Sequence, residues 1–276
     1  MNGILDAIKN RKILLASHRG VNGGNIPCNS LQGYQIAINQ GADIIELDVS
    51  VSKDRKLYLH HPGMEWLHLG KHINLSEMNS SDIKGIMLAN QDACETQYPL
   101  ATLEDALKLL KGKCFINVDK FWSAPEEISN EIRKYDMADQ CIVKSYANEN
   151  TANILKEYAK GMQYMAMVRN KEQVYDNLFD KDINFIGLEL LFSKDTDEIA
   201  SKEFIDDLHD KGMIAWGNSI VYNYRDVIAA DHTDDVALLG NPEHGWAWFS
   251  KQGFDIIQTD WLMQCSQYLI NKGLRR

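Results

Sequence analysis

Two apolar segments of the sequence carry carboxylates at spacings that suit a metal ion. Glu46 and Asp48 stand two positions apart within residues 43–49, and Asp119 follows the apolar run 114–118. Residues two apart on a strand project from one face, where like charges repel unless a cation lies between them. Hard divalent ions prefer oxygen ligands, so the pattern predicts a Mg²⁺ or Ca²⁺ site. Asp119 alone is also typical of a helix N-cap.

Histidines close two further segments. His18 and Arg19 follow the first apolar run. His60 ends a short run at residues 56–60, and His61 comes directly after it. Alternation along a strand turns only one of the last pair toward a site, and we expect it to be His61, with His60 packed on the hairpin or in solvent. Two histidines near a divalent ion suit phosphodiester cleavage, one as base or nucleophile and one as acid. The alternative is a buried structural His18 beside an ion-paired Arg19.

Eight short apolar, β-branched runs alternate with stretches of helical period. They span residues 12–17, 43–49, 114–118, 140–144, 162–168, 184–190, 213–216 and 255–259. This alternation is typical of parallel strands joined by helices, and eight repeats favour a closed TIM-type (β/α)8 barrel over an open sheet. Residues 56–60 add a small hairpin insertion after the second strand. Active sites of such barrels lie at the carboxyl ends of the strands, where the polar residues named above stand.

The length of 276 residues fits one barrel, so we expect a single domain over residues 1–276. The clearest helix start is at Thr102, where Thr102 and Asp105 resemble a capping box. Residues 231–245 are loop-like and long enough to form a lid.

The composition narrows the classes of partner. A formal net charge of −10 argues against nucleic acid and favours a small-molecule substrate bound by local cations. The five cysteines form an odd set without a CxxC pair, which is typical of reduced thiols in a cytoplasmic protein. No run of about 18 uninterrupted apolar residues occurs, so no transmembrane segment is expected. The oligomeric state is not readable from the sequence.

Six segments between about residue 12 and residue 262 resemble, in order, motifs of the glycerophosphodiester phosphodiesterase family. They are residues 18–20 (HRG), 27–30 (PCNS, for PENT), 41–49 (GADIIELDV, for GADxIExDV), 52–61 (for the TKDG…H hairpin), 98–104 (for IPTLEE) and 253–260 (GFDIIQTD, for GVDGIITD). The resemblance implies a TIM barrel with a hairpin insertion. It also implies that His18 and His61 are the catalytic pair. The implied metal ligands are Glu46, Asp48 and Asp119, and the residues implied to bind phosphate are Arg19 and Asn29.

Several positions depart from the family pattern. Cys28, Arg55 and Pro62 replace its Glu, Gly and Asp, and Phe121 stands where Lys is usual. Lys144 closes the next strand and is expected to supply the missing positive charge, a surface lysine being the alternative. Lys120 is the next candidate for that charge.

Three residues at the ends of the sixth and seventh runs are expected to line the substrate mouth. They are Glu189, Trp216 and Asn218. A buried carboxylate there would suit a hydroxyl of the substrate, while a large aromatic at that position is equally consistent with simple core packing.

The resemblance implies metal-dependent hydrolysis of glycerophosphodiesters to glycerol phosphate and an alcohol, as in lipid metabolism. Attack by the vicinal hydroxyl, through a cyclic phosphate, and direct attack by water both remain open. One alternative is a phospholipase-D-like barrel that cleaves lysophospholipids, and another is a non-catalytic barrel that only binds phosphoesters. The presence of both His18 and His61 argues against the last, because binding alone needs no acid/base pair.

Overall fold

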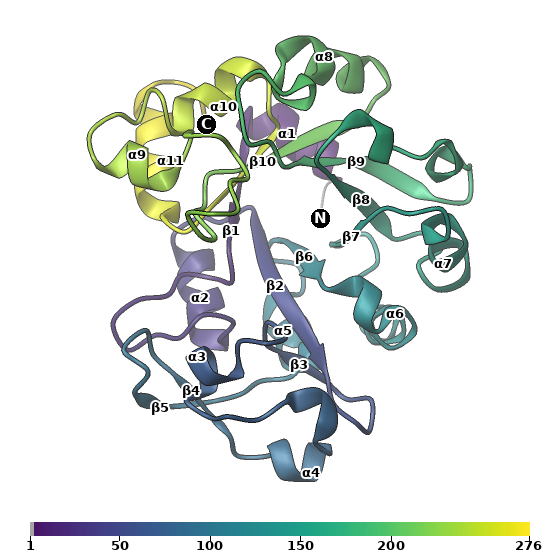
Figure 1. Cartoon of the computed structure of the whole chain (residues 1–276), viewed down its shortest axis with the longest axis vertical. Coiled ribbons are helices and arrows are strands. Elements are labelled where there is room, and N and C mark those ends of the chain that lie inside the picture. The colour runs from purple at the N-terminus through teal and green to yellow at the C-terminus, as the bar shows by residue number, and fades with distance from the viewer. Residues whose placement is uncertain (1–2) are drawn as a thin grey trace.

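The computed structural model describes residues 3–276 and forms a closed barrel of eight parallel strands (Figure 1). The ring closes where β1 pairs with both β2 and β11. The barrel strands are β1 (Leu14–Ser17), β2 (Ile44–Val51), β6 (Phe115–Asp119), β7 (Cys141–Tyr146), β8 (Gln163–Val168), β9 (Asn184–Leu190), β10 (Ile214–Asn218) and β11 (Ile256–Thr259). The predicted TIM-type barrel is confirmed, and each predicted run overlaps one barrel strand.

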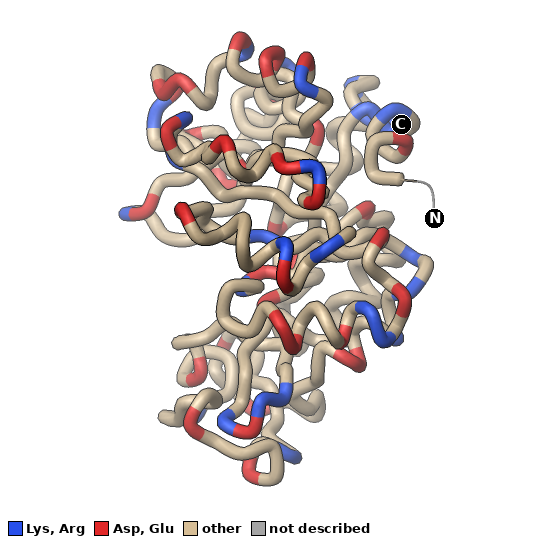
Figure 2. Tube along the Cα trace, turned by 90° about the vertical axis from the view of Figure 1, so that its right-hand side faces the viewer, with Lys and Arg blue, Asp and Glu red and all other residues tan. Residues whose placement is uncertain are grey.

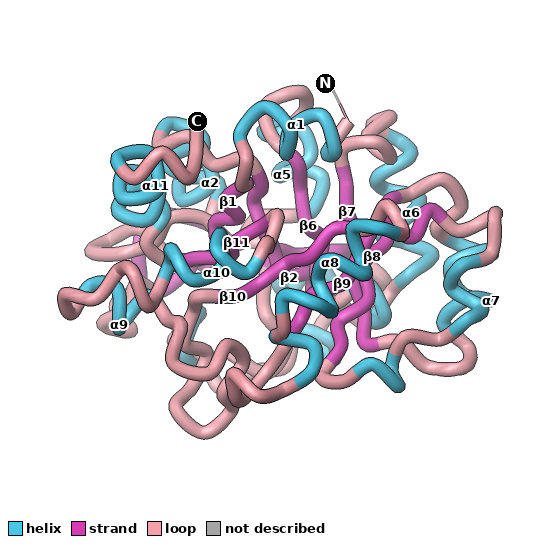
Figure 3. The backbone as a smooth tube through the Cα atoms, turned by 90° about the horizontal axis from the view of Figure 1, so that it is seen from above, coloured by secondary structure: helices cyan, strands magenta, loops and turns pink. Residues whose placement is uncertain are grey.

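Helices surround the strands, as the view from above shows (Figure 3). They are α1 (Ile4–Arg11), α2 (Leu31–Asn39), α3 (Glu65–Leu69), α4 (Ser80–Ile83), α5 (Leu103–Leu110), α6 (Pro125–Lys134), α7 (Thr151–Tyr158), α8 (Lys202–Asp210), α9 (Asp234–Leu238), α10 (Trp246–Gln252) and α11 (Leu262–Asn271). The predicted capping box opens α5, where Thr102 accepts from the backbone N–H of Asp105 and the Asp105 carboxylate accepts from that of Thr102. None of the described helices combines the length and apolar character needed to cross a membrane.

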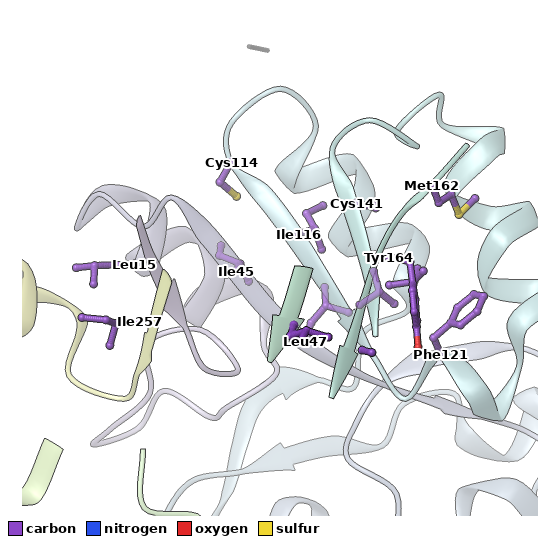
Figure 4. Close-up of a cluster of buried hydrophobic side chains, with 14 of the residues drawn as sticks. Leu15, Ile45, Leu47, Cys114, Ile116, Phe121, Cys141, Met162, Tyr164 and Ile257 are labelled. Atoms are coloured by element: carbon purple, nitrogen blue, oxygen red, sulfur yellow. The ribbon is translucent and has the colours of Figure 1, made fainter. Parts of the chain in front are cut away.

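Alternation along the strands separates two apolar layers. Ile45 and Leu47 on β2 belong to the large cluster between strands and helices, part of which Figure 4 shows. Ile44, two positions before Glu46, belongs instead to a smaller cluster inside the barrel, which also contains Ile4 of α1. Glu46 therefore projects into the barrel above an apolar floor, because residues two apart share a face.

The segment between β2 and α5 forms a lobe below the barrel in Figure 1. β3 (Leu57–Leu59) pairs antiparallel with β2, which confirms the predicted hairpin strand. The lobe is larger than the predicted insertion, since it adds α3, α4, the turn η1 (Leu75–Glu77) and the two-stranded sheet of β4 (Met87–Ala89) and β5 (Glu95–Pro99). β5 is mostly exposed, so it has no apolar periodicity by which the sequence analysis could detect it.

The expectation that helices fill every gap fails between β8 and β9. The described residues of this crossover form only 3₁₀ turns, η3 (Lys171–Gln173) and η4 (Asp176–Phe179). Asn and Asp recur through this crossover, and their side chains compete with helix by bonding to nearby backbone groups. A further turn, η5 (Glu198–Ala200), precedes α8.

Residues 231–245 are loop-like except for α9, and a buried carboxylate anchors the segment. A role for this segment as a lid stays a prediction. The Oδ1 atom of Asp234 accepts from Ser219 Oγ at 2.7 Å, Trp246 Nε1 at 2.6 Å and Thr259 Oγ1 at 2.7 Å. Its Oδ2 accepts from the backbone N–H of Asp260 at 2.9 Å. Four donors on one carboxylate fasten the segment to the ends of β10 and β11.

Lys and Arg are mixed with Asp and Glu along most of the chain. In the view of Figure 2, Lys and Arg lie interspersed with Asp and Glu and do not form separate faces. The net charge of −10 is therefore spread out. Binding of a ligand then depends on the charged residues close to it at the barrel mouth.

We expect Asp234→Ala to lower the free energy of unfolding by about 2–4 kcal/mol, because four donors would lose a charged acceptor in a buried site. Urea denaturation followed by circular dichroism measures this difference. Asp235→Ala, one position later and exposed, is the matched control and should change stability little. Equal stability of the two variants would show that residues 231–245 are not held by Asp234.

Candidate active site

The three predicted metal ligands lie together at the mouth of the barrel. Glu46 and Asp48 project inward from β2, and Asp119 ends the neighbouring strand β6, with Asp48 and Asp119 directly paired in register. One carboxylate oxygen from each of the three lies within 4.8 Å of those of the others. Both strands deliver these groups to the same mouth because the strands of the barrel are parallel.

Charge and burial create strain in this acidic cluster. Burial and the neighbouring Asp48 raise the pKa of Glu46 to about 7. Burial also opposes ionisation of Asp48, yet Arg19 and Lys120 hold its pKa below the usual range. Arg19 Nε lies 2.8 Å from Asp48 Oδ2, and Lys120 Nζ lies 3.5 Å from Asp48 Oδ1. The Oδ1 atom of Asp119 is buried without a hydrogen-bond partner, so the cluster has acceptor capacity that a divalent cation would satisfy.

His18 and His61 line the same hollow of about 240 Å³ as the three carboxylates. The Asp260 carboxylate accepts from His18 Nδ1 at 2.8 Å. Burial alone would lower the pKa of His18, but Asp260 outweighs it, and the pKa is raised. The Pro62 carbonyl accepts from His61 Nδ1 at 2.9 Å, and burial lowers the pKa of His61. The two rings thus differ in their affinity for a proton.

His60 points away from this hollow, as strand alternation predicted. Its side chain is 1% exposed, and its ring lies edge-on to that of His68 with centroids 5.5 Å apart. Burial lowers the pKa of His60 to about 4. A neutral, enclosed histidine in this position fits a structural role in the hairpin lobe.

A tight turn after β1 brings Arg19 to the cluster. Arg19 has a φ of 55° and donates its backbone N–H to Glu46 Oε2 at 2.9 Å. Gly20 follows with a φ of 75°, and a Cβ atom there would lie 2.8 Å from Tyr34 Cδ1. Only glycine fits this position, so the turn itself depends on the residue after Arg19.

Asn29 lies behind the cluster rather than in the lining of the hollow. Its side-chain nitrogen donates to Asp48 Oδ2 at 2.9 Å, and its oxygen accepts from Tyr34 Oη at 3.1 Å. Asn29 therefore orients Asp48, whereas the family resemblance implies that it contacts phosphate.

Lys144 and Trp216 lie below the hollow, inside the barrel. Lys144 Nζ is 2.9 Å from Glu189 Oε2 and 3.2 Å from the centroid of the Trp216 ring. The Lys144 side chain is 2% exposed, so the alternative of a surface lysine is wrong. Trp216 is fully buried in the inner apolar cluster. Asn218 donates to Glu189 Oε1 at 2.8 Å, and these two residues do line the hollow.

Several lining residues have no counterpart among the predicted site residues. They are Trp122, Tyr146, Arg169, Tyr222, Asp226 and Gln258, with Asp260 beside His18. Asp260 and Gln258 stand at the end of the eighth predicted run, so the same rule that selected Asp119 could have found them. The others lie in loops or at strand ends with no periodic signal.

The fold and the mouth define a TIM barrel with an acidic, histidine-bearing site. A family model described as a domain of unknown function matches residues 164–269. The glycerophosphodiester phosphodiesterase of Caldanaerobacter subterraneus subsp. tengcongensis is 27% identical over 157 residues, which cover 52% of this chain and 63% of the relative. The match thus spans under two thirds of that relative's length.

Solved structures resemble the whole barrel. A glycerophosphoryl diester phosphodiesterase from Parabacteroides distasonis matches with a TM-score of 0.77 at 19% identity, over 99% of this chain and 93% of that one. An Oleispira antarctica phosphodiesterase in complex with the product sn-glycerol-3-phosphate matches with a TM-score of 0.64 at 17% identity, over 94% and 96%. Together the structural matches show that the chain shares the barrel fold of these phosphodiesterases.

In the metal-free protein we expect Glu46→Gln to raise the free energy of unfolding at pH 8 by about 1–3 kcal/mol. The folded-state pKa of Glu46 is raised to about 7 from 4.5, so the protonated side chain stabilises the fold at low pH, and this stability is lost as the pH rises through 7. Glutamine mimics the protonated form and avoids the loss. Urea denaturation in chelator between pH 5 and pH 8 should show the difference growing with pH.

The exposed Glu126→Gln is the matched control and should show no such trend. A divalent ion should reverse the order, because the wild type would gain more binding free energy than Glu46→Gln. Equal stability of wild type and Glu46→Gln at pH 8 would contradict a strained acidic cluster.

Proposed function

We propose that this chain is a single-domain, metal-dependent phosphodiesterase that hydrolyses glycerophosphodiesters to glycerol phosphate and an alcohol. The observation that carries the proposal is the convergence of two histidines and three carboxylates on one hollow at the barrel mouth. The relatives named glycerophosphodiester phosphodiesterase support the same substrate class.

Glu46, Asp48 and Asp119 would hold the divalent ion, Mg²⁺ or Ca²⁺. Their oxygens gather within 4.8 Å, and carboxylates are the ligands both ions prefer. The ion would supply positive charge to the phosphate oxygens. Arg19, whose Nε is 2.8 Å from Asp48, stands next to this place and can bind a phosphate oxygen through its remaining donors.

Hydrogen bonding assigns different roles to the two histidines. His18 is held by a carboxylate, which stabilises its charged form, so it is the group to protonate the oxygen of the departing alcohol. His61 is held only by a carbonyl oxygen at Nδ1, which leaves the lone pair of Nε2 free to accept a proton from the attacking group. Environments that move two pKa values apart are typical of an acid and base pair.

Glu189 and Asn218 are suited to recognise hydroxyl groups of the glycerol. Lys144 and Asn218 each hold one oxygen of the Glu189 carboxylate, which fixes its orientation at the edge of the hollow. The Oδ1 atom of Asn218 is buried without a partner and can accept from a hydroxyl.

The experiment that tests the proposal is turnover of glycerophosphoglycerol and glycerophosphoethanolamine after chelation, with Mg²⁺, Ca²⁺ or Mn²⁺ added back. Activity should disappear with chelation and return with at least one ion. We expect His61→Ala to lower kcat by about 10²- to 10⁴-fold, the range for loss of a general base.

His60→Ala is the matched control, and it should retain most of the activity because His60 does not line the hollow. The reverse pattern would assign the base to His60. Full turnover after thorough chelation would reject the metal-dependent mechanism.

Lys120 is better suited than Lys144 to supply charge at the phosphate, because its ammonium group lines the hollow beside Asp119 and Asp48, whereas Lys144 lies below the hollow. Lys120→Met should lower kcat/KM by at least about tenfold, or about 1.4 kcal/mol, for every phosphodiester. Lys144→Met should instead weaken only glycerol-bearing substrates, through Glu189. Comparison of glycerophosphoglycerol with bis(p-nitrophenyl) phosphate separates the two effects. Equal losses on both substrates in Lys144→Met would return the phosphate-binding role to Lys144.

A further inference from the structure

A second and larger hollow, of about 700 Å³, adjoins the site. The two hollows share His18, Arg19 and Tyr222 in their linings, whereas His61 and the three carboxylates belong only to the smaller one. The hollows therefore meet beside the position proposed for the phosphate. A phosphodiester has two alcohol arms on one phosphorus, so a substrate bound at this junction can place one arm in each hollow.

The second hollow is lined by both polar and apolar side chains. A group of apolar ones comes from α3, from the loop after β10 and from the start of α11, and it includes Met64, Leu67, Val221, Tyr222, Trp261 and Met263. Leu67 is 58% exposed and Met263 is 51% exposed, so this apolar surface is open to solvent. Open apolar surface beside a catalytic histidine is typical of a substrate groove.

The charged residues that line the second hollow are already paired, so a charged substrate arm would find no free partner there. Arg19 and Asp260 are the only Lys, Arg, Asp or Glu residues in its described lining. Asp260 is engaged by His18 at 2.8 Å, and Arg19 by Asp48. The smaller hollow, by contrast, is lined by Lys120, Arg169 and Asp226 together with the site carboxylates.

We infer that the arm opposite the glycerol is a neutral alcohol bearing an aliphatic chain, seated in the second hollow. The inference rests on the proposed phosphodiesterase function, since it names the substrate class of the same site. The glycerol arm lies against Glu189 and Asn218, and the chain lies along Leu67 and Met263. A cationic arm would find no free carboxylate in this lining, because Asp260 is paired with His18.

The test is a series of glycerophospho-n-alkanols from ethanol to decanol, each below its critical micelle concentration. kcat/KM should rise by about two- to fourfold for each methylene until the hollow is filled, fourfold being the effect of complete burial of one methylene. The ester of 3,3-dimethylbutanol, the neutral isostere of choline, should be cleaved faster than glycerophosphocholine. A flat series, with the ethanol ester readily cleaved, would overturn the inference and leave the proposed function intact.

Two variants and a control locate the effect. Leu67→Asn and Met263→Gln should flatten the chain-length dependence, because both side chains line the larger hollow and neither lies in the smaller one. Leu239→Asn is the control, since Leu239 is 89% exposed and lines neither hollow. A slope that persists in both variants would overturn the assignment of the chain to this groove.

Binding of n-alkyl phosphates, measured by titration calorimetry, separates failure of the inference from failure of the proposed function. Affinity should rise with chain length in the wild type and not in Leu67→Asn. If no ester is cleaved but this dependence is seen, the groove is established and the hydrolysis is not. If affinity is independent of chain length, the inference is overturned whatever the catalytic result.

Discussion

The repulsion among three carboxylates, two of them buried, is the constraint on which the rest of this barrel mouth depends. Glu46 and Asp48 share the inner face of β2, and Asp119 faces Asp48 from β6. Such a cluster persists only where cations and donors surround it. The turn at Arg19, the Asn29 amide and Lys120 all converge on Asp48, while Glu46 keeps a raised pKa that shows incomplete compensation. A divalent ion would supply the positive charge that the cluster still lacks.

The barrel separates this polar layer from the interactions that stabilise the fold. Inward positions are apolar at the floor, at Ile44 and Ile142, and polar two residues higher, at Glu46 and Lys144. Lys144 lies at the boundary, with Trp216 against its ammonium group and Glu189 above it. A buried cation at this level compensates the charge of one carboxylate of the mouth, that of Glu189, without entering the hollow.

The sequence predicted the elements whose apolar residues recur regularly. It also predicted the direction of side chains where alternation along a strand decides it. All eight barrel strands and the inward direction of Glu46, Asp48 and His61 follow from alternation, and alternation alone separated His61 from His60. Depth along the barrel axis is not encoded in this way, so Lys144 and Trp216 were expected at the mouth although they lie below it. The anchoring of residues 231–245 was not predicted, because Asp234 looks in sequence like any polar loop residue. Its partners come from three distant segments.

The two hollows also give the reaction a direction. His18 borders both hollows, and Asp260 stabilises its proton, whereas His61 borders only the smaller hollow. An acid must reach the oxygen that departs, and a base must reach the group that attacks. Under the proposed function, the arm in the larger hollow is then the leaving alcohol, protonated by His18, and attack begins in the smaller hollow beside His61. A glycerol hydroxyl held by Glu189 and a water molecule would both start from that side, so the same residues serve either form of attack.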